Sequence, residues 1–422
     1  MWAKLLLIVR CFNLSFVYNA FFEVQKYNNM EKEKIVIFTY SLGGAGAERV
    51  AANLLNNLST EKYDIHLVLM NTGIEYEIKK DQKIYFIEKG ELYESEVMKF
   101  LKIPFLAYRL AKYCKKENIK LVLAIMNRPN FIASIAKIFG LKSKVLISER
   151  FYTPYYYNTQ SFTGKIKLAL LKWAYPKADA ILPNSRGTAE ALKNLYGINS
   201  EFIVVKNPVD INKIKGLMIL PVEETFTLEK FTFLNVAAFR EEKNQELLID
   251  TVAELRHLDF QLIFVGKGPN IEAMKSKVSR LKLDDKIVFA GFTSNPYQYM
   301  HKADCFLLSS LCEGFPNVLL ESMVCGLPII SVDCKVGPRE LLAPGTSYDT
   351  VIGDTEFEMA EYGILTAPDS RKSMVAAMTW ALRNPEKLKE FKEKITANAY
   401  HFQIEKVCNE FSEIFDSYLT KV

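Results

Sequence analysis

The feature that most constrains the fold is a regular alternation of short apolar segments with amphipathic helical patterns. In the first half of the chain the apolar segments are residues 34–40, 65–70, 83–87, 120–125, 145–148, 180–183 and 202–205. In the second half they are residues 231–238, 260–266, 286–291, 303–309, 329–332 and 363–367. Strand-length segments separated by helical patterns predict parallel, doubly wound sheets. A chain of 422 residues exceeds what one core usually organises, so we expect an α/β protein with two Rossmann-like domains.

The domain boundaries follow the changes in this pattern. The segment Lys206-Asn-Pro-Val-Asp210 closes the first half, and a locally acidic stretch follows it. We predict an N-terminal domain over residues 34–208, a C-terminal domain over residues 209–385, and C-terminal helices over residues 386–422.

Residues 1–33 are predicted to be an extension. Their apolar part is interrupted by Lys4 and Arg10, which is too broken for a transmembrane span, and no small-residue cleavage site follows. Met30 directly precedes the first predicted strand. We therefore expect an upstream translation start, with the enzyme beginning at Met30. A weak membrane-associating segment is the alternative.

One stretch of the second half combines two carboxylates with the start of a helix. Glu313 follows a predicted strand, and seven residues separate it from Glu321. Pro316 suits the first position of a helix. The amides at the positive helix N-terminus would then belong to Asn317, Val318 and Leu319. Two carboxylates beside free amides at the end of a strand can hold hydroxyls on either side of a phosphate, as a sugar nucleotide requires.

With Gly-Phe-Pro-Asn-Val between the carboxylates and Gly326-Leu-Pro after them, this stretch resembles the signature of glycosyltransferase family 4. Members of that family are retaining enzymes with the GT-B fold, in which two Rossmann-like domains face a cleft. The resemblance implies that Glu313 meets the donor sugar and Glu321 meets the ribose. It implies that the diphosphate meets the backbone of Gly314, Phe315, Asn317, Val318 and Leu319. An ordinary amphipathic helix is the alternative for the carboxylate pair alone, but the surrounding motifs favour a donor site.

A glycine-rich turn follows the first predicted strand. Gly44 and Gly46 would let the backbone approach a phosphate or sugar closely. The turn nearly matches a dinucleotide fingerprint, but Arg49 replaces the third glycine and Asn71, not an acidic residue, ends the next strand. NAD binding is therefore excluded. The segment resembles the glycine-rich turn of the same family, which borders the active cleft, although a purely structural turn is the alternative.

Polar side chains end several predicted strands of the first half. They include the acceptor-side candidates Asn127, Asn130, Glu149 and Arg150. Ligands of parallel sheets sit at the carboxyl ends of strands, although loop residues are polar by default. The family often has a histidine near the position of Asn127, and its absence leaves that contact open.

Departure of a diphosphate from an anomeric carbon requires cationic groups. By the resemblance, Lys243 matches the lysine of the family, whereas Ala238 stands where a phosphate-binding arginine often occurs. We expect Arg240, on the same loop, to replace that arginine. An ion pair of Arg240 with Glu241 or Glu242 is the alternative.

The net charge and one basic segment indicate which binding partners the protein could have. A net charge of +5 suits polyanionic ligands or anionic membranes. The sequence contains no zinc-finger spacing of Cys and His and no block of Lys and Arg that would indicate nucleic-acid binding. Residues 164–177, with the aromatic residues 151–157 before them, are basic and aromatic enough for a membrane-interface surface. A packed helix with solvated lysines is the alternative. The seven cysteines include no Cys-x2-Cys pair and indicate buried thiols in a reducing compartment.

We therefore expect a retaining glycosyltransferase that moves a hexosyl unit from a nucleoside diphosphate sugar to a glycan or lipid-linked acceptor, in surface polysaccharide or lipopolysaccharide synthesis. Glu313, Lys243 and Arg240 are the expected catalytic residues. No Asp-x-Asp motif occurs, so no metal or other cofactor is expected. The expected location is the cytoplasm, including the inner face of the membrane. A nucleotide-sugar epimerase and a non-catalytic sugar-nucleotide-binding subunit are the rival interpretations.

Overall fold

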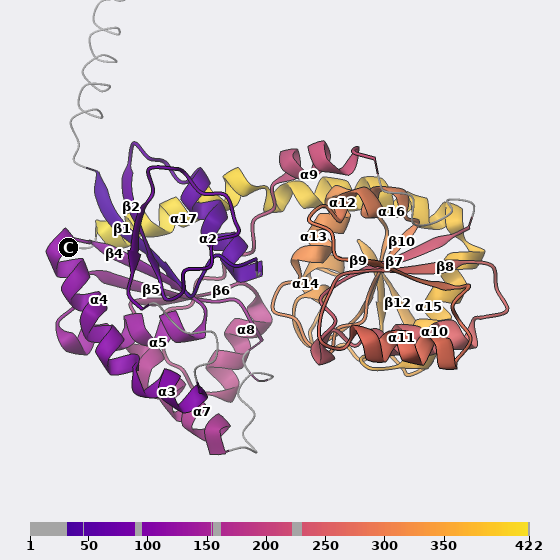
Figure 1. Cartoon of the computed structure of the whole chain (residues 1–422), viewed down its shortest axis with the longest axis horizontal. Helices are drawn as coiled ribbons and strands as arrows, with labels where there is room; N and C mark the ends of the chain where they lie inside the picture. The colour runs from indigo at the N-terminus through magenta and orange to yellow at the C-terminus, as the bar shows by residue number, and fades with distance from the viewer. Residues whose placement is uncertain are drawn as a thin grey trace, which may run out of the picture.

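The computed structural model of the chain describes residues 32–44, 46–88, 95–152, 154, 162–221 and 230–420. These residues form two α/β units side by side, each built around its own sheet (Figure 1). The architecture confirms the two Rossmann-like domains that the alternating segments predict. The extension before residue 32 and most of the aromatic segment 151–157 lie outside the described residues.

The N-terminal sheet is parallel and six-stranded, in the order β3-β2-β1-β4-β5-β6. Its strands are β1 (Glu33–Thr39), β2 (Tyr63–Leu69), β3 (Lys83–Phe86), β4 (Leu121–Ile125), β5 (Lys144–Glu149) and β6 (Ala180–Pro183). The helices and short helical turns between them are α2 (Gly46–Asn57), α3 (Glu96–Leu101), α4 (Ile103–Glu117), α5 (Asn127–Ala136), η1 (Lys137–Phe139), α7 (Phe162–Ala174), η2 (Tyr175–Lys177), α8 (Arg186–Glu190) and η3 (Ala191–Leu195).

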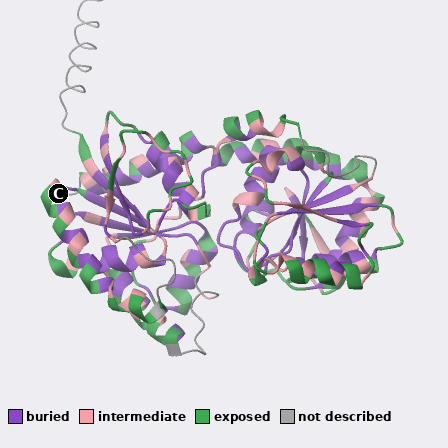
Figure 2. Cartoon of the chain, in the orientation of Figure 1, coloured by how far each residue is buried: buried purple, intermediate pink, exposed green. Residues whose placement is uncertain are grey.

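Successive side chains of a strand point to opposite sides, and helices cover both sides of this sheet, so its central strands are buried on both faces. On β1, Val36 and Phe38 join the core beneath α4 and α5, whereas Ile35 and Ile37 join the core beneath α2. Figure 2 shows buried residues along the central strands and exposed residues on the outer helices. This double burial explains why the strands are continuous apolar runs in the sequence.

The C-terminal sheet has seven strands in the order β12-β13-β11-β10-β7-β8-β9. They are β7 (Thr232–Val236), β8 (Gln261–Val265), β9 (Ile287–Gly291), β10 (Cys305–Leu308), β11 (Ile329–Val332), β12 (Phe357–Ala360) and β13 (Gly363–Thr366). The helices around it are η4 (Glu241–Lys243), α10 (Gln245–Glu254), α11 (Ile271–Arg280), α12 (Tyr297–Lys302), α13 (Asn317–Val324), α14 (Pro338–Leu342) and α15 (Arg371–Arg383). Among the strands that the structure describes, only β12 is antiparallel to its neighbour, and the sequence pattern did not predict this edge strand.

The predicted strand at residues 202–205 was wrong as a full strand. Phe202 forms an isolated β-bridge with Ile181, and the amide of Val205 donates to the carbonyl of Pro183 at 2.9 Å. Pro183 has no amide hydrogen, so the ladder beside the short strand β6 is incomplete.

Two crossings join the domains. After β6 the chain passes to α9 (Ile211–Met218) and enters the C-terminal domain. After that domain, α16 (Pro385–Ala399), η5 (Tyr400–Phe402) and α17 (Ile404–Leu419) run back along one side of the molecule (Figure 1). On α17, Phe411 and Phe415 are buried in the core of the N-terminal domain, and Asp416 accepts a 2.9 Å hydrogen bond from Tyr63. The chain end therefore packs on the first domain.

Loops at the carboxyl ends of the two sheets meet between the domains. The side-chain amide of Asn207, in the crossing segment, donates to the carbonyl of Phe315 at 3.0 Å and to the side-chain oxygen of Asn317 at 2.7 Å. A Cβ atom on Gly314 would lie 2.6 Å from the carbonyl oxygen of Arg150. Only glycine allows this approach of the β10 loop to the end of β5.

Candidate active site

Glu313 and Lys243 form the central pair of the site. Glu313 lies in the loop between β10 and α13, and Lys243 ends the short helical turn η4 after β7. The Lys243 Nζ donates to the Glu313 Oε1 at 2.7 Å, and both side chains are mostly buried. Burial alone would lower the pKa of Lys243, but the charge and hydrogen bond of Glu313 outweigh it and raise that pKa. The site therefore keeps a fixed ammonium group beside a carboxylate.

Arg240 is the N-cap of the same turn and, unlike this pair, is mostly exposed. Its side chain is 65% exposed, and its Nη1 is 4.0 Å from the Glu242 Oε1. The contact is at the outer limit of an ion pair and is open to solvent, so it holds the guanidinium weakly. The structure thus shows the surface contact, and the replacement of the arginine missing at Ala238 stays a prediction.

Helix α13 begins one residue later than the sequence predicts. Pro316 has extended backbone angles (φ −73°, ψ 105°) and is the N-cap, so the first helical residue is Asn317. The amide of Leu319 donates to the Pro316 carbonyl at 3.1 Å. This amide already has a partner, so within the first turn the amides of Asn317 and Val318 are the ones that could donate to an anion.

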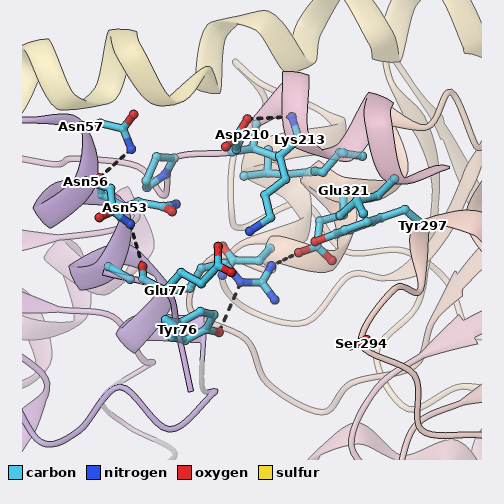
Figure 3. Close-up of a pocket in the computed structure, with 18 residues that line it drawn as sticks. Asn53, Asn56, Asn57, Tyr76, Glu77, Asp210, Lys213, Ser294, Tyr297 and Glu321 are labelled. Carbon is cyan, nitrogen blue, oxygen red and sulfur yellow. Dashed lines mark hydrogen bonds and ion pairs between the residues drawn. The ribbon is translucent and has the colours of Figure 1, made fainter. Parts of the chain in front are cut away.

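Glu321, in the second turn of α13, faces the other domain. Its carboxylate forms an ion pair with Arg49 of α2 and is only 8% exposed. Chiefly because of this negative charge, the pKa of Arg49 is raised. The Arg49 Nε also donates to the Tyr76 hydroxyl at 3.4 Å. In Figure 3, the dashed lines that end at Tyr76 and Glu321 mark these two contacts.

The Arg49–Glu321 pair lines a cavity of about 360 Å³ between the domains. From the N-terminal domain, the polar face of α2 contributes Asn53, Asn56 and Asn57 (Figure 3). The opposite wall contains Ser294, Tyr297 and Asn317, and the start of α9 supplies Asp210 and Lys213. Hydroxyl, amide and charged groups on several sides suit a polar ligand such as a nucleoside. The i, i+4, i+7 spacing from Arg49 to Asn53 and Asn56 is the sequence signal that could have identified this face.

The glycine-rich turn lies against the start of α13. Gly44 has a φ of 101°, which favours glycine, and α2 begins at Gly46. A Cβ atom on Gly46 would lie 3.0 Å from the side-chain nitrogen of Asn317. The turn therefore borders the expected diphosphate position, while Ala45 lies outside the described residues.

The acceptor-side candidates cluster at the end of β5. Glu149 is buried and accepts a 2.5 Å hydrogen bond from Tyr175. With its amide nitrogen turned toward Glu149, Asn127 donates to both carboxylate oxygens at 2.9 and 3.2 Å. Burial raises the pKa of Glu149 to about 7. Asn127 also lines a cavity of the N-terminal domain.

Asn130 and Arg150 are enclosed by the protein. Asn130 donates to the carbonyl of Ser148 at 3.0 Å. The Arg150 Nη1 donates to the Asn207 side-chain oxygen at 2.9 Å and to the Val205 carbonyl at 3.0 Å. Arg150 therefore ties β5 to the interdomain segment.

The described residues contain no group of three or more His, Cys, Asp or Glu side chains that is arranged to hold a metal ion. None of the helices in these residues is long and apolar enough to cross a membrane. The six cysteines in these residues are buried and unpaired.

Two sequence families match the chain. "Glycosyltransferase Family 4" matches residues 44–213, and "Glycosyl transferases group 1" matches residues 220–398. Among curated proteins, the chain is 35% identical over 381 residues to the N-acetylgalactosamine-N,N'-diacetylbacillosaminyl-diphospho-undecaprenol 4-alpha-N-acetylgalactosaminyltransferase of Campylobacter jejuni, covering 90% of this chain and 98% of that protein. A lipopolysaccharide 1,6-galactosyltransferase of Salmonella typhimurium is 32% identical over 173 residues, covering 40% of this chain and 46% of that protein.

Solved structures share the fold. Sucrose-phosphate synthase from Thermosynechococcus elongatus superposes with a TM-score of 0.76 at 15% identity, covering 93% of this chain and all of that one. Anabaena HepE, solved in complex with UDP, superposes with a TM-score of 0.69 at 17% identity, covering 91% of this chain and all of that one. Together with the family matches, these likenesses confirm the resemblance stated from the Glu313–Glu321 stretch: the chain belongs to the family 4 glycosyltransferases and has the GT-B fold.

Proposed function

We propose that the protein transfers a hexosyl unit from a nucleoside diphosphate sugar, with retention of configuration, to a glycan carried on a lipid diphosphate. The observation that carries this proposal is the position of the Lys243–Glu313 pair, at the start of α13 and between the two sheets. An ammonium group and helix N-terminal amides at one point suit a diphosphate, and the adjacent carboxylate suits sugar hydroxyls.

In the proposed reaction, the bond between the anomeric carbon and the diphosphate oxygen breaks, and the acceptor hydroxyl forms the new bond on the same face. The acceptor proton passes to the leaving diphosphate. Lys243 and the amides of Asn317 and Val318 stabilise the charge that develops on that group. Glu313 orients the donor sugar, and Glu321 accepts from the ribose hydroxyls. We propose that these groups suffice without a metal ion.

The identity of the substrates is proposed from the relatives. The Campylobacter jejuni protein is named for the transfer of N-acetylgalactosamine to a glycan on diphospho-undecaprenol. Its similarity spans nearly its whole length, which supports an N-acetylhexosamine donor and a polyprenyl diphosphate acceptor for this chain. We accordingly propose a cytoplasmic enzyme that works peripherally at the inner face of the membrane, in surface polysaccharide or lipopolysaccharide synthesis.

The test is a transfer assay with purified protein. UDP-N-acetylgalactosamine, UDP-N-acetylglucosamine, UDP-galactose and UDP-glucose are each incubated with disaccharide-diphospho-undecaprenol, with and without EDTA. We expect an extended lipid-linked glycan with one donor, an α-anomeric product by NMR, and an unchanged rate with EDTA. Conversion of the donor without any acceptor would instead identify an epimerase. Donor binding in thermal-shift measurements without turnover would identify a non-catalytic subunit.

A further inference from the structure

A further contact between the domains joins α8 to α14 and does not involve the Arg49–Glu321 pair. The side chain of Glu340, on α14, accepts a 3.2 Å hydrogen bond from the amide of Gly187, the second residue of α8. In Figure 1, α8 of the N-terminal domain faces α14 of the C-terminal domain. The first amides of a helix have no acceptor within the helix, so a carboxylate of the other domain satisfies this one.

Gly187 lies where a larger side chain would not fit. Its backbone is helical, and alanine would be the better residue in a helix. A Cβ atom at this position would lie 2.7 Å from the Cγ2 atom of Val336, which is buried. The glycine therefore allows the loop between β11 and α14 to approach α8 closely.

The Glu340 side chain is enclosed by polar groups at this contact. Glu340 is only 8% exposed and, with Arg186, Lys206 and Tyr348, lines a cavity of about 30 Å³. Burial raises the pKa of Tyr348, and the negative charge of Glu340 and its hydrogen bond with this hydroxyl raise it further. The cavity is far smaller than a ligand pocket, so this cluster joins the domains and does not hold a substrate.

Helix α14 is itself anchored to the C-terminal domain. Arg339, the residue before Glu340, is almost fully buried and donates to Asp333 at 2.8 Å and to Glu358 at 2.8 Å. Glu340 therefore reaches α8 from a helix that ion pairs hold in place.

The loop between β11 and α14 also reaches the turn before α13. Gly337, in this loop, has a φ of 96°. A Cβ atom on Gly337 would lie 2.7 Å from the Pro316 Cδ and 3.1 Å from the carbonyl oxygen of Gly314. Both residues lie between Glu313 and the first residue of α13. The loop that contacts α8 therefore also packs on the turn that follows Glu313.

We propose that Glu340 is a positioning residue for the transfer: by accepting from the Gly187 amide, it holds the loop between β11 and α14, and with it the turn after Glu313, in place against the N-terminal domain. The inference rests on the proposed function and adds a contact that sets the position of the donor turn. The groups proposed to bind the nucleotide lie in the C-terminal domain, and Arg49 is not part of this contact. Its loss therefore affects turnover more than nucleotide affinity.

The test uses a steric change and its compensation. Gly187→Ala adds a Cβ atom where Val336 packs, and it should lower the kcat of transfer about tenfold while the dissociation constant for UDP stays within about twofold of wild type. Gly187→Ala/Val336→Ala makes room for that atom and should recover most of the lost kcat. Glu340→Ala should lower kcat as Gly187→Ala does, whereas Glu340→Gln keeps an acceptor oxygen and should retain most of it.

Hydrogen exchange measures the same coupling without any transfer. The amides of residues 313–319 should exchange faster in Gly187→Ala than in wild type, and the double variant should return them toward the wild-type rate. The matched control is Gly216→Ala in α9, where an added Cβ atom has open space. This variant should behave like the wild type in both measurements.

Three outcomes would overturn the proposal. They are a wild-type kcat in Gly187→Ala, a loss of kcat that Val336→Ala does not relieve, and equal losses in Glu340→Gln and Glu340→Ala. Unchanged exchange at residues 313–319 in Gly187→Ala would overturn it as well. If the wild-type protein transfers no sugar, the proposed function fails, and hydrogen exchange still decides whether this contact sets the donor turn.

Discussion

Glu313 and Glu321 sit on one loop and helix but have different neighbours, Lys243 in one case and Arg49 in the other. We therefore expect their alanine variants to fail differently. Glu321→Ala should weaken both the donor and the free nucleoside diphosphate by about 1–3 kcal/mol, since charged hydrogen bonds to the ribose are lost. Glu313→Ala should reduce donor binding and turnover but spare the nucleotide. Calorimetric titration with UDP measures this, and equal UDP affinity in wild type and Glu321→Ala would refute the assignment.

Lys243 and Arg240 differ in burial, and their variants test which cation stabilises the leaving group. If Arg240 replaces the arginine missing at Ala238, both Lys243→Ala and Arg240→Ala should lose turnover about 100-fold, as is typical for a lost charge-stabilising contact. Single-turnover kinetics with saturating donor measure the effect. Near-normal turnover of Arg240→Ala, beside an impaired Lys243→Ala, would leave Arg240 as a surface residue paired with Glu242.

The buried carboxyl of Glu149 is expected to make the free energy of unfolding depend on pH. Burial raises the pKa of this carboxyl from 4.5 to about 7. Between these values the unfolded chain releases a proton that the folded protein retains. Retention of this proton adds at most about 3 kcal/mol to the free energy of unfolding. This contribution is complete below about pH 4.5, declines as the pH rises, and is lost above about pH 7. Urea unfolding of wild type and Glu149→Gln should show the variant gaining relative stability between about pH 5 and pH 8. A difference that does not change with pH would contradict this.

At the scale of elements, α2 and α13 meet through the Arg49–Glu321 ion pair. A carboxylate has enough lone pairs to accept from Arg49 and from a ribose hydroxyl together. We therefore expect Arg49 to orient Glu321, although it belongs to the other domain. We expect Arg49→Gln to weaken UDP binding about tenfold, because the buried carboxylate loses its charged partner.

The control for this prediction is Arg109→Gln, on the outer helix α4. This variant removes the same charge from the same domain and should bind UDP normally. A normal UDP affinity in Arg49→Gln would show that the ion pair only joins the domains and does not prepare the nucleotide site.

Most elements of the fold were predictable because the strands are buried on both faces and are therefore continuous apolar runs. The edge strand β12 was missed because its four residues, Phe357-Glu-Met-Ala360, are not fully buried and therefore do not form an apolar run. Residues 202–205 were overpredicted because apolar composition does not show that Pro183 on the neighbouring strand lacks a donor. Pro316 was misplaced by one residue, since proline suits both the N-cap and the first helical position.

The candidate site was less predictable than the fold. The Glu313–Glu321 segment could be identified because its chemistry is local in the sequence. The partner of each carboxylate could not be identified from the pattern alone, because the Arg49–Glu321 contact joins positions 272 residues apart. Likewise, the sequence does not show that Asn130, in α5, and Arg150, after β5, are enclosed by the protein and donate to neighbouring protein groups.

At the scale of the whole molecule, the last helix completes the first domain. Phe411 is fully buried in the N-terminal core, together with Ile404 and Phe415 of the same helix. Phe391, on the preceding helix α16, is buried in the C-terminal core instead. We expect Phe411→Ala to lower the free energy of unfolding by about 3–5 kcal/mol. It should also lower hydrogen-exchange protection in β1, β2 and β4, although these strands are far from Phe411 in the sequence. Phe391→Ala should lower protection in β10 and β11 and leave β1 protected. Loss of protection in the C-terminal sheet of Phe411→Ala would show that the two domains unfold as one unit and that α17 stabilises both.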